Sequence, residues 1–224
     1  MSRNSAGLSR QRIVEEALRI IDGQGLRRLT MRRLGDALEV EAMAVYHHFP
    51  LGKEQLFDAI VEYVTDATPR RPAEVDDDEE ELVEEPAEEP PPPWDARIGR
   101  WAHEYRARLL RHAGALPLLI HRRPDTPAAL RSREDHVAAF REAGLSGPAV
   151  ADAAAALESY VFGAALTQVR SESPHGAAEP ETLERLFQRA GDAATDFDSR
   201  FLAGLDALIL GHTGVRPAHT AAPA

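Results

Sequence analysis

Residues 26–57 read LRRLTMRRLGDALEVEAMAVYHHFPLGKEQLF, and this stretch decides the fold of the first part of the chain. Thr30 is placed to cap a short helix over residues 31–38, because a threonine hydroxyl accepts a hydrogen bond from the free amides of a first helical turn. A charged turn at residues 39–41 separates this helix from a second one at residues 42–48. Two short helices joined by a tight turn are typical of a helix-turn-helix motif.

Two further helices flank this motif. Apolar residues recur at three- and four-residue steps between Ser9, a typical N-cap, and Gly25, a typical C-terminal stop. Another amphipathic helix is predicted to begin after residues 50–52. We therefore predict a small all-helical domain over residues 1–66. The side chains expected in the core of its helix-turn-helix are Leu34, Leu38, Val40, Val45 and Phe49.

The charge of the chain is unevenly distributed. The formal net charge is −11, which by itself argues against a nucleic-acid partner. Residues 74–89 contain eleven carboxylates and no base, and the rest of the chain is neutral. Residues 2–53 hold nine bases and six acids, so DNA beside the helix-turn-helix would meet a positive local field. Net charge therefore does not exclude a DNA-binding function.

The acidic run belongs to a proline-rich segment, residues 67–93, in which no apolar period could bury a face. We interpret this segment as a disordered linker. Two roles stay open for its carboxylates. They compete with phosphates for the arginines at residues 27–33, or they are a solvated spacer without function.

A second helical domain is predicted over residues 94–213. Period-two runs of β-branched residues are absent from the sequence, so the fold class is all-α. A frayed tail is expected over residues 214–224. The predicted helical segments are 94–112, 116–120, 126–143, 148–169 and 183–210, with a loop at residues 171–180.

Several classes of function are excluded or disfavoured by what the sequence lacks. The chain has no cysteine, no apolar run long enough to span a membrane and no apolar signal-peptide core, so we expect a soluble cytoplasmic protein. His103 and Glu104 begin a zinc-protease-like pattern, but Ala107 stands where its second histidine belongs. His103, His112 and His121 are nine residues apart, which would point successive members to opposite helix faces. We predict no catalytic residue, no metal site and no cofactor.

The quoted motif closely resembles the DNA-binding domain of the TetR (tetracycline repressor) family. The similarity covers about residues 10–64 and rests on the sequences LTMRRL, YHHFP and KEQL at residues 29–34, 46–50 and 53–56. Two departures stand out. Glu39 occupies a turn position where the family usually has glycine, and one residue is extra between Pro50 and Lys53. The segments LPLLI, FREAGLS and YVFG, beginning at Leu116, Phe140 and Tyr160, look like the C-terminal domain of the branch nearest the tetracycline repressor.

The resemblance implies a set of DNA contacts. Arg32 is the expected reader of guanine, whereas short side chains of the second helix would reach only thymine methyl groups. For Tyr46 and His48 two roles stay open, contact with a phosphate and packing in the core. The implied DNA-binding residues are Thr30, Arg32, Ala42, Met43, Ala44, Tyr46, His47, His48 and Lys53.

The resemblance also implies a homodimer that reads two half-sites and a small-molecule pocket in the second domain. Small and apolar stripes suggest a dimer surface, although the same stripes could face the core of one chain. Aromatic residues with polar tips are candidate pocket walls, with core packing as the alternative. The dimer residues are Ala153, Leu157, Val161, Ala164, Phe197, Phe201, Leu205 and Leu208. The pocket residues are Trp101, Tyr105, His121, Tyr160 and Phe162.

The sequence thus favours a transcriptional repressor of the TetR family, not an enzyme. Its expected partners are a palindromic double-stranded DNA operator, a second copy of itself and a small ligand that releases it, with no membrane involved. The alternatives are a non-specific architectural DNA-binding protein and a regulator that acts without a small ligand.

Overall fold

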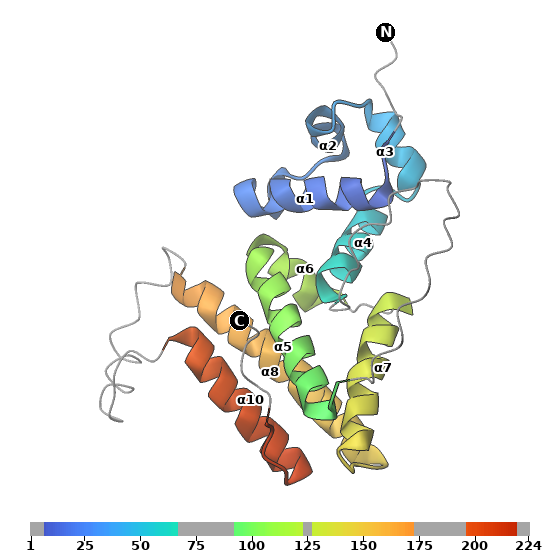
Figure 1. Cartoon of the computed structure of the whole chain (residues 1–224). Helices are drawn as coiled ribbons and strands as arrows, with labels where there is room; N and C mark the ends of the chain where they lie inside the picture. Colours follow the sequence, from blue (N-terminus) through green and yellow to red (C-terminus); the bar gives the residue numbers. More distant parts are fainter. Residues whose placement is uncertain (1–6, 67–91, 123–126, 173–195, 219–224) are drawn as a thin grey trace, which may run out of the picture.

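The computed structural model describes residues 7–66, 92–122, 127–172 and 196–218, and within these ranges the chain is helical without a strand (Figure 1). The N-terminal domain contains α1 (Arg10–Gln24), the 3₁₀ turn η1 (Leu26–Arg28), α2 (Met31–Ala37), α3 (Ala42–His48) and α4 (Lys53–Thr65). The C-terminal domain contains α5 (Trp94–Arg111), the 3₁₀ turn η2 (Ala113–Ala115), α6 (Leu116–His121), α7 (Pro127–Glu142), α8 (Pro148–Glu172) and α10 (Phe197–Thr213). The predicted all-α class is confirmed.

The helix ends of the N-terminal domain follow the capping residues of the sequence. Ser9 Oγ accepts a hydrogen bond from the Arg12 amide at 3.1 Å and begins α1. The Gly25 amide donates to Ile21 O at 2.7 Å and ends that helix at a positive φ of 83°. Thr30 Oγ1 accepts from the Arg33 amide at 3.1 Å and begins α2. These three caps lie where the sequence predicts them.

The helix-turn-helix packs through a small core. Leu34, Val40, Val45 and Phe49 are buried, as predicted, whereas Leu38 is only half-buried. Gly35 lets α2 and α3 approach closely, since a Cβ there would lie 3.0 Å from Val40 O. This core fixes the angle between the two short helices.

The turn between α2 and α3 contains a strained residue. Glu39 has a φ of 56°, and it is the only non-glycine residue with positive φ in the described part of the chain. A side chain in this left-handed region costs roughly 1–2 kcal/mol. The turn therefore keeps the geometry that glycine usually supplies, and Glu39 bears the strain.

The C-terminal domain is arranged around α5. This helix packs against α7 and α8, and α8 packs against α10 on its other side (Figure 1). Arg106 of α5 is buried at this junction. Its Nη1 donates to Asp198 Oδ1 of α10 and its Nη2 to Gln168 Oε1 of α8, each at 2.6 Å. Its guanidinium also lies 4.7 Å from the Phe201 ring centroid, so one side chain ties three helices together.

The structure shows where the residues of the predicted dimer stripe lie in the single chain. The side chains of Ala153, Leu157, Val161, Phe201 and Leu205 are buried within the single chain, where α8 and α10 pack on their own domain. The alternative, burial in the core of one chain, holds for these five residues. Ala164, Phe197 and Leu208 are only partly buried. Burial within a chain and burial between chains give the same apolar period, so the sequence could not separate them.

Two boundaries also differ from the sequence prediction. Helix α8 continues through Glu172, so the first two residues of the predicted loop 171–180 are helical. The start of the tail is docked, not frayed: Pro217 is buried and the Ala218 amide donates to Asp95 Oδ2 at 2.8 Å. The linker at residues 67–91, residues 173–195 and the end of the tail lie outside the described residues.

Among the described residues, several polar contacts join the two domains. Asp22 of α1 binds His112 Nδ1 at 2.9 Å and accepts from the Gly114 amide at 3.2 Å. Arg108 Nη1 of α5 donates to Tyr63 O of α4 at 3.2 Å, and Arg122 pairs with Glu54 and Asp58 of α4. A Cβ on Gly114 would lie 2.8 Å from Ile21 O, so α1 rests directly on η2.

Within the described residues, α8 is the one helix long and apolar enough to cross a membrane by length and composition. The sequence prediction of no such span overlooked it. This is weak evidence for a membrane, because the core helix of a helical domain passes the same test. Here α8 packs against α5, α7 and α10.

Candidate nucleic-acid interface

Thr30 stands at the edge of the helix-turn-helix with its side chain exposed. The hydroxyl oxygen accepts from the Arg33 amide, and the hydroxyl hydrogen is still available as a donor. The preceding residue, Leu29, is fully buried and anchors this edge to the domain core. Thr30 can therefore offer a hydrogen bond to an outside acceptor without giving up its role as a cap.

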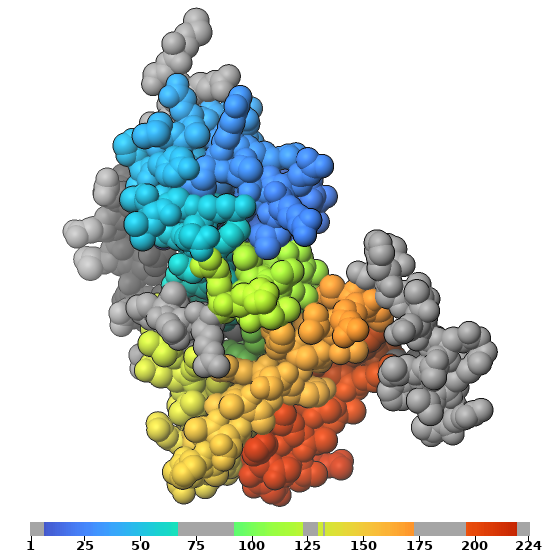
Figure 2. Space-filling view, turned by 180° about the vertical axis from the view of Figure 1, so that it is seen from behind, coloured from blue at the N-terminus to red at the C-terminus, as the bar shows by residue number. Residues whose placement is uncertain are grey.

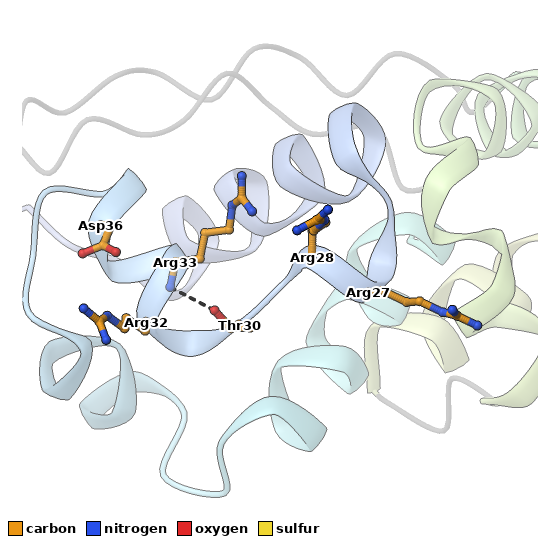
Figure 3. A pocket seen from close by; sticks show the side chains of 6 residues that line it. All are labelled: Arg27, Arg28, Thr30, Arg32, Arg33 and Asp36. Carbon is orange, nitrogen blue, oxygen red and sulfur yellow. Dashed lines mark hydrogen bonds between the residues drawn. The ribbon is translucent and has the colours of Figure 1, made fainter.

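Arginines surround Thr30. Arg27, Arg28, Thr30, Arg32, Arg33 and Asp36 line a hollow of about 360 Å³ (Figure 3). Arg33 is turned toward α1 and hydrogen-bonds Gln24. Arg27, Arg28 and Arg32 are exposed and have no hydrogen-bond or ion-pair partner among the described residues. Three guanidinium groups without a counter-charge give this edge a positive local field, which attracts anions.

Helix α3 exposes the face that the sequence assigns to base edges. Val45 is fully buried and fixes the helix, while Met43 is 64% exposed and Tyr46 and His47 also face solvent. Ala42, Ala44 and His48 are half-buried. The main-chain oxygen of His48 accepts from Arg10 Nη1 at 2.6 Å, which holds the end of α3 on α1. The exposed face is short and mostly apolar.

Lys53 begins α4 and is half-buried. Its Nζ lies 5.0 Å from the centroid of the Phe57 ring, so the charge is held against an aromatic face. Gly52, directly before it, has a φ of 70°, which glycine adopts without strain. This turn contains the extra residue relative to the usual family spacing, and it holds the main chain of Lys53 at the start of the helix.

The predicted pocket residues of the C-terminal domain separate into two groups. Trp101 and Tyr105 lie together on α5, with their ring centroids 5.1 Å apart. Tyr160 instead packs on α10, where its hydroxyl donates to Phe201 O at 2.8 Å. His121 is exposed on α6 and Phe162 is half-buried on α8. The structure therefore does not bring the five together: His121 is exposed, and the polar tip of Tyr160 is bound by the main chain of α10.

His136 is the residue that the sequence prediction missed. It is 1% exposed, its ring centroid lies 4.5 Å from that of Trp101, and neither ring nitrogen has a hydrogen-bond partner. Its Nε2 lies 3.5 Å from Glu158 Oε1, an ion-pair distance too long for a good hydrogen bond. A signal was present, because His136 shares a helical face with the apolar Ala139 and Phe140.

Glu158 and Arg133 are half-buried beside His136. Arg133 donates to both carboxylate oxygens of Glu158, at 2.8 and 3.1 Å. Burial opposes ionisation of Glu158, but the contacts with His136 and Arg133 outweigh it and hold its pKa below the ordinary value. Burial, followed by the charge of Glu158, raises the pKa of Tyr105. The cluster thus combines an aromatic wall, an ionised carboxylate and an imidazole with unused polar atoms.

Among the residues that the structure describes, no group of three or more histidine or acidic side chains is placed to hold a metal ion. The described histidines at 103, 112 and 121 are not brought together: His103 stacks near Phe201, His112 binds Asp22, and His121 faces solvent.

Comparison with known proteins agrees with this architecture. Residues 13–60 match the family model of bacterial regulatory proteins, tetR family, and residues 85–215 match that of the tetracyclin repressor-like C-terminal domain. The chain is 31% identical over 162 residues, 72% of its length, both to the HTH-type transcriptional repressor DrrR1 of Streptomyces coeruleorubidus and to an HTH-type transcriptional regulator of Saccharopolyspora erythraea. The match spans only 54% and 61% of those relatives.

A solved structure gives the corresponding likeness in three dimensions. The Streptomyces coelicolor TetR family protein ActR in complex with actinorhodin superposes with a TM-score of 0.65 at 25% identity. The superposition covers 92% of this chain and 97% of ActR.

Proposed function

The chain belongs to the TetR family of bacterial regulatory proteins, and on that premise we propose that it is a cytoplasmic, sequence-specific transcriptional repressor. In this proposal it binds a palindromic operator as a homodimer and is released by a small-molecule ligand. The observation that carries the DNA-binding part is the edge at Thr30. Free arginines there adjoin a short recognition helix that is fixed by Val45 and exposes Met43, Tyr46 and His47.

The side chains at this edge suit two different kinds of DNA contact, those with phosphates and those with bases. Thr30 and Lys53 offer donors to phosphate oxygens, which position a protein on DNA without reading sequence. Arg32 is free and can form two parallel hydrogen bonds with guanine O6 and N7. Met43 and the two neighbouring alanines offer apolar contact with thymine methyl groups. Few side chains therefore read bases in one half-site, which favours a dimer on two half-sites.

Selection of bound sequences from a random duplex pool tests this function. An enriched inverted repeat, with half-sites separated by a whole number of helical turns, is the expected result. A pool that stays random would contradict the repressor and support the alternative of a non-specific architectural protein.

The exposed faces of α8 and α10 support a corrected dimer surface. Ala155, Ser159, Gly163 and Thr167 recur every four residues on the exposed side of α8. Ala203, Ala207 and Gly211 do the same on α10. Small residues let helices approach closely. We assign the homodimer interface to these two faces, which lie on the side of each helix opposite to the stripe that the sequence suggests.

Sedimentation velocity of Ala207→Arg tests this surface. The side chain is exposed in one chain, so the variant should fold and yet lose the dimer. Ala107→Arg is the matched control, because Ala107 is exposed on α5, away from both faces. An Ala207→Arg protein that remains dimeric would place the interface elsewhere.

The cluster of Trp101, Tyr105, His136 and Glu158, in which Tyr105 and His136 are buried, supports the ligand part of the proposal. An unpartnered buried polar group costs about 1–3 kcal/mol, a cost that a bound ligand would recover. The surface is hollowed between α7 and α8, where α5 is seen at the floor (Figure 2). Because ActR is described in complex with actinorhodin, we propose an aromatic ligand with polar substituents for this chain as well.

Titration with actinorhodin, followed by the fluorescence of Trp101 in a Trp94→Phe background, tests the pocket. The expected result is quenching that His136→Leu abolishes. A His136→Leu protein that still quenches would show that His136 does not contact the ligand.

A further inference from the structure

We propose that Arg27 and Arg28 bind backbone phosphates of the DNA duplex beyond the one expected at Thr30, so that the hollow between η1 and α2 extends the DNA-binding surface. The inference rests on the proposed DNA-binding function. The resemblance assigns DNA contacts to Thr30, Arg32, α3 and Lys53, and it assigns none to η1. The two arginines are therefore an addition to the predicted set.

The hollow is a cationic strip. Four arginines and one carboxylate, that of Asp36, stand around its 360 Å³. Figure 3 shows Arg28 and Arg33 reaching up beside Thr30, Arg32 lying near Asp36, and Arg27 extending from the opposite end. The guanidinium groups do not converge on one point. A chain of anions along the strip fits this spread better than a single anion.

The arginines of the hollow differ in whether their side chains have a partner, and this distinguishes a structural arginine from those that are free to bind DNA. Arg33 hydrogen-bonds Gln24 and so connects α2 to α1. Arg27 and Arg28 have no partner in the described residues, whereas Arg19, one turn before the end of α1, is paired with Glu16. Like charges gathered without a counter-charge repel one another, and an outside polyanion relieves that repulsion.

The occupant is a duplex backbone because the strip is continuous with the expected DNA edge. Thr30 lines the same hollow as Arg27 and Arg28. Successive phosphates of one strand are spaced about 3.4 Å along the helix axis, so a strand that passes Thr30 presents further phosphates on either side. Free inorganic phosphate shares the chemistry but has no reason to occupy both ends of the strip.

The test is the salt dependence of DNA binding by Arg27→Gln/Arg28→Gln, measured by fluorescence anisotropy on a random 30-base-pair duplex and on a selected operator. Each lost phosphate contact should reduce the magnitude of the slope of log affinity against log salt by about 0.9, so the double variant should lose roughly 1.8 per subunit and about 3.6 as a homodimer. The loss should be equal on both duplexes. Arg19→Gln/Arg131→Gln is the matched control, with the same change in charge at two exposed positions away from the hollow.

Three results would overturn the inference. The first is a salt slope that the double variant leaves unchanged, and the second is a change of slope on the selected operator alone. The third is that inorganic phosphate, at constant ionic strength, displaces DNA from the wild type but not from the double variant. The single variants Arg27→Gln and Arg28→Gln, checked by circular dichroism, keep the test valid if the double variant misfolds. If the wild type selects no sequence from the random pool, the proposed repressor is rejected. The salt slope on random duplex tests the roles of Arg27 and Arg28 independently of that result.

Discussion

Two sets of arginines, one in each domain, are used in opposite ways. Arg27, Arg28 and Arg32 of the N-terminal domain are exposed and lack partners in the described residues. In the C-terminal domain, Arg106 binds Asp198 and Gln168, and Arg133 binds Glu158 through both carboxylate oxygens. The first set keeps its charge for an outside anion, while the second uses it to hold helices together. The number of arginines in a region therefore says less about its function than whether they are paired.

The largest expected effect tests the paired set. Arg106→Ala should lower the free energy of unfolding by about 2–4 kcal/mol, because two hydrogen bonds to a charged group and the contact with Phe201 are lost. Arg32→Ala is the control in the other domain and should change stability by less than about 0.5 kcal/mol. Urea unfolding of both variants makes the comparison. Equal losses of unfolding free energy would mean that the exposed and the paired arginines contribute equally to stability.

DNA binding gives the converse test. Arg32→Ala should cost about 1–3 kcal/mol at one base pair of each half-site, since a bidentate contact with guanine is removed. Lys53→Ala should weaken binding to all sequences alike. Affinities measured on a set of single-base operator variants separate the two patterns, and a uniform loss for Arg32→Ala would reject its role as a base reader.

A substitution at Gly114 should weaken the packing of η2 against α1, where the two domains meet. A Cβ at this position would lie 2.8 Å from Ile21 O, so Gly114→Ala should destabilise the protein by about 1–3 kcal/mol. Gly23→Ala is the matched control, because nothing lies within 4 Å of a Cβ there and alanine favours the helix. If denaturant unfolding shows that both variants gain stability, the close contact of α1 with η2 is not a constraint.

The strain in the N-terminal domain should be relieved by Glu39→Gly. The left-handed φ of 56° costs a side chain roughly 1–2 kcal/mol, and the added flexibility of glycine offsets about half of that. We expect a gain of about 0.5–1 kcal/mol in thermal unfolding. Glu39→Ala keeps the strain and should show no such gain, so a matching gain there would trace the effect to the lost carboxylate.

The smallest effect concerns pH and the paired Glu158. Because its pKa is lowered in the folded state, its ionisation stabilises the protein above the ordinary carboxyl pKa. That contribution is lost as the pH falls through the lowered value. Glu158→Gln should therefore lose less stability than the wild type on acidification from about pH 6 to pH 3. A parallel fall in both proteins would mean that the pairing with Arg133 does not contribute.

The sequence predicts the N-terminal domain better than the C-terminal domain for a local reason. Ser9, Gly25 and Thr30 act on their own helix ends, so their effect can be inferred without knowing what packs nearby. The strain at Glu39 also follows from one residue and its turn. In contrast, the surroundings of His136 and Tyr160 come from other helices: His136 lies beside Trp101 of α5 and Glu158 of α8, and Tyr160 packs on α10.

The sequence by itself determined the all-α class, the helix ends of the helix-turn-helix, the family and the positive local charge around Thr30. These depend on periodicity, capping and composition, which act over a few residues. Only the tertiary structure decided which apolar stripe of α8 and α10 is the core, which arginines stay free, and which histidine is buried without a partner. Those properties depend on contacts between segments that are distant in the sequence. The apolar period of a helix alone does not decide which of its faces packs against those segments.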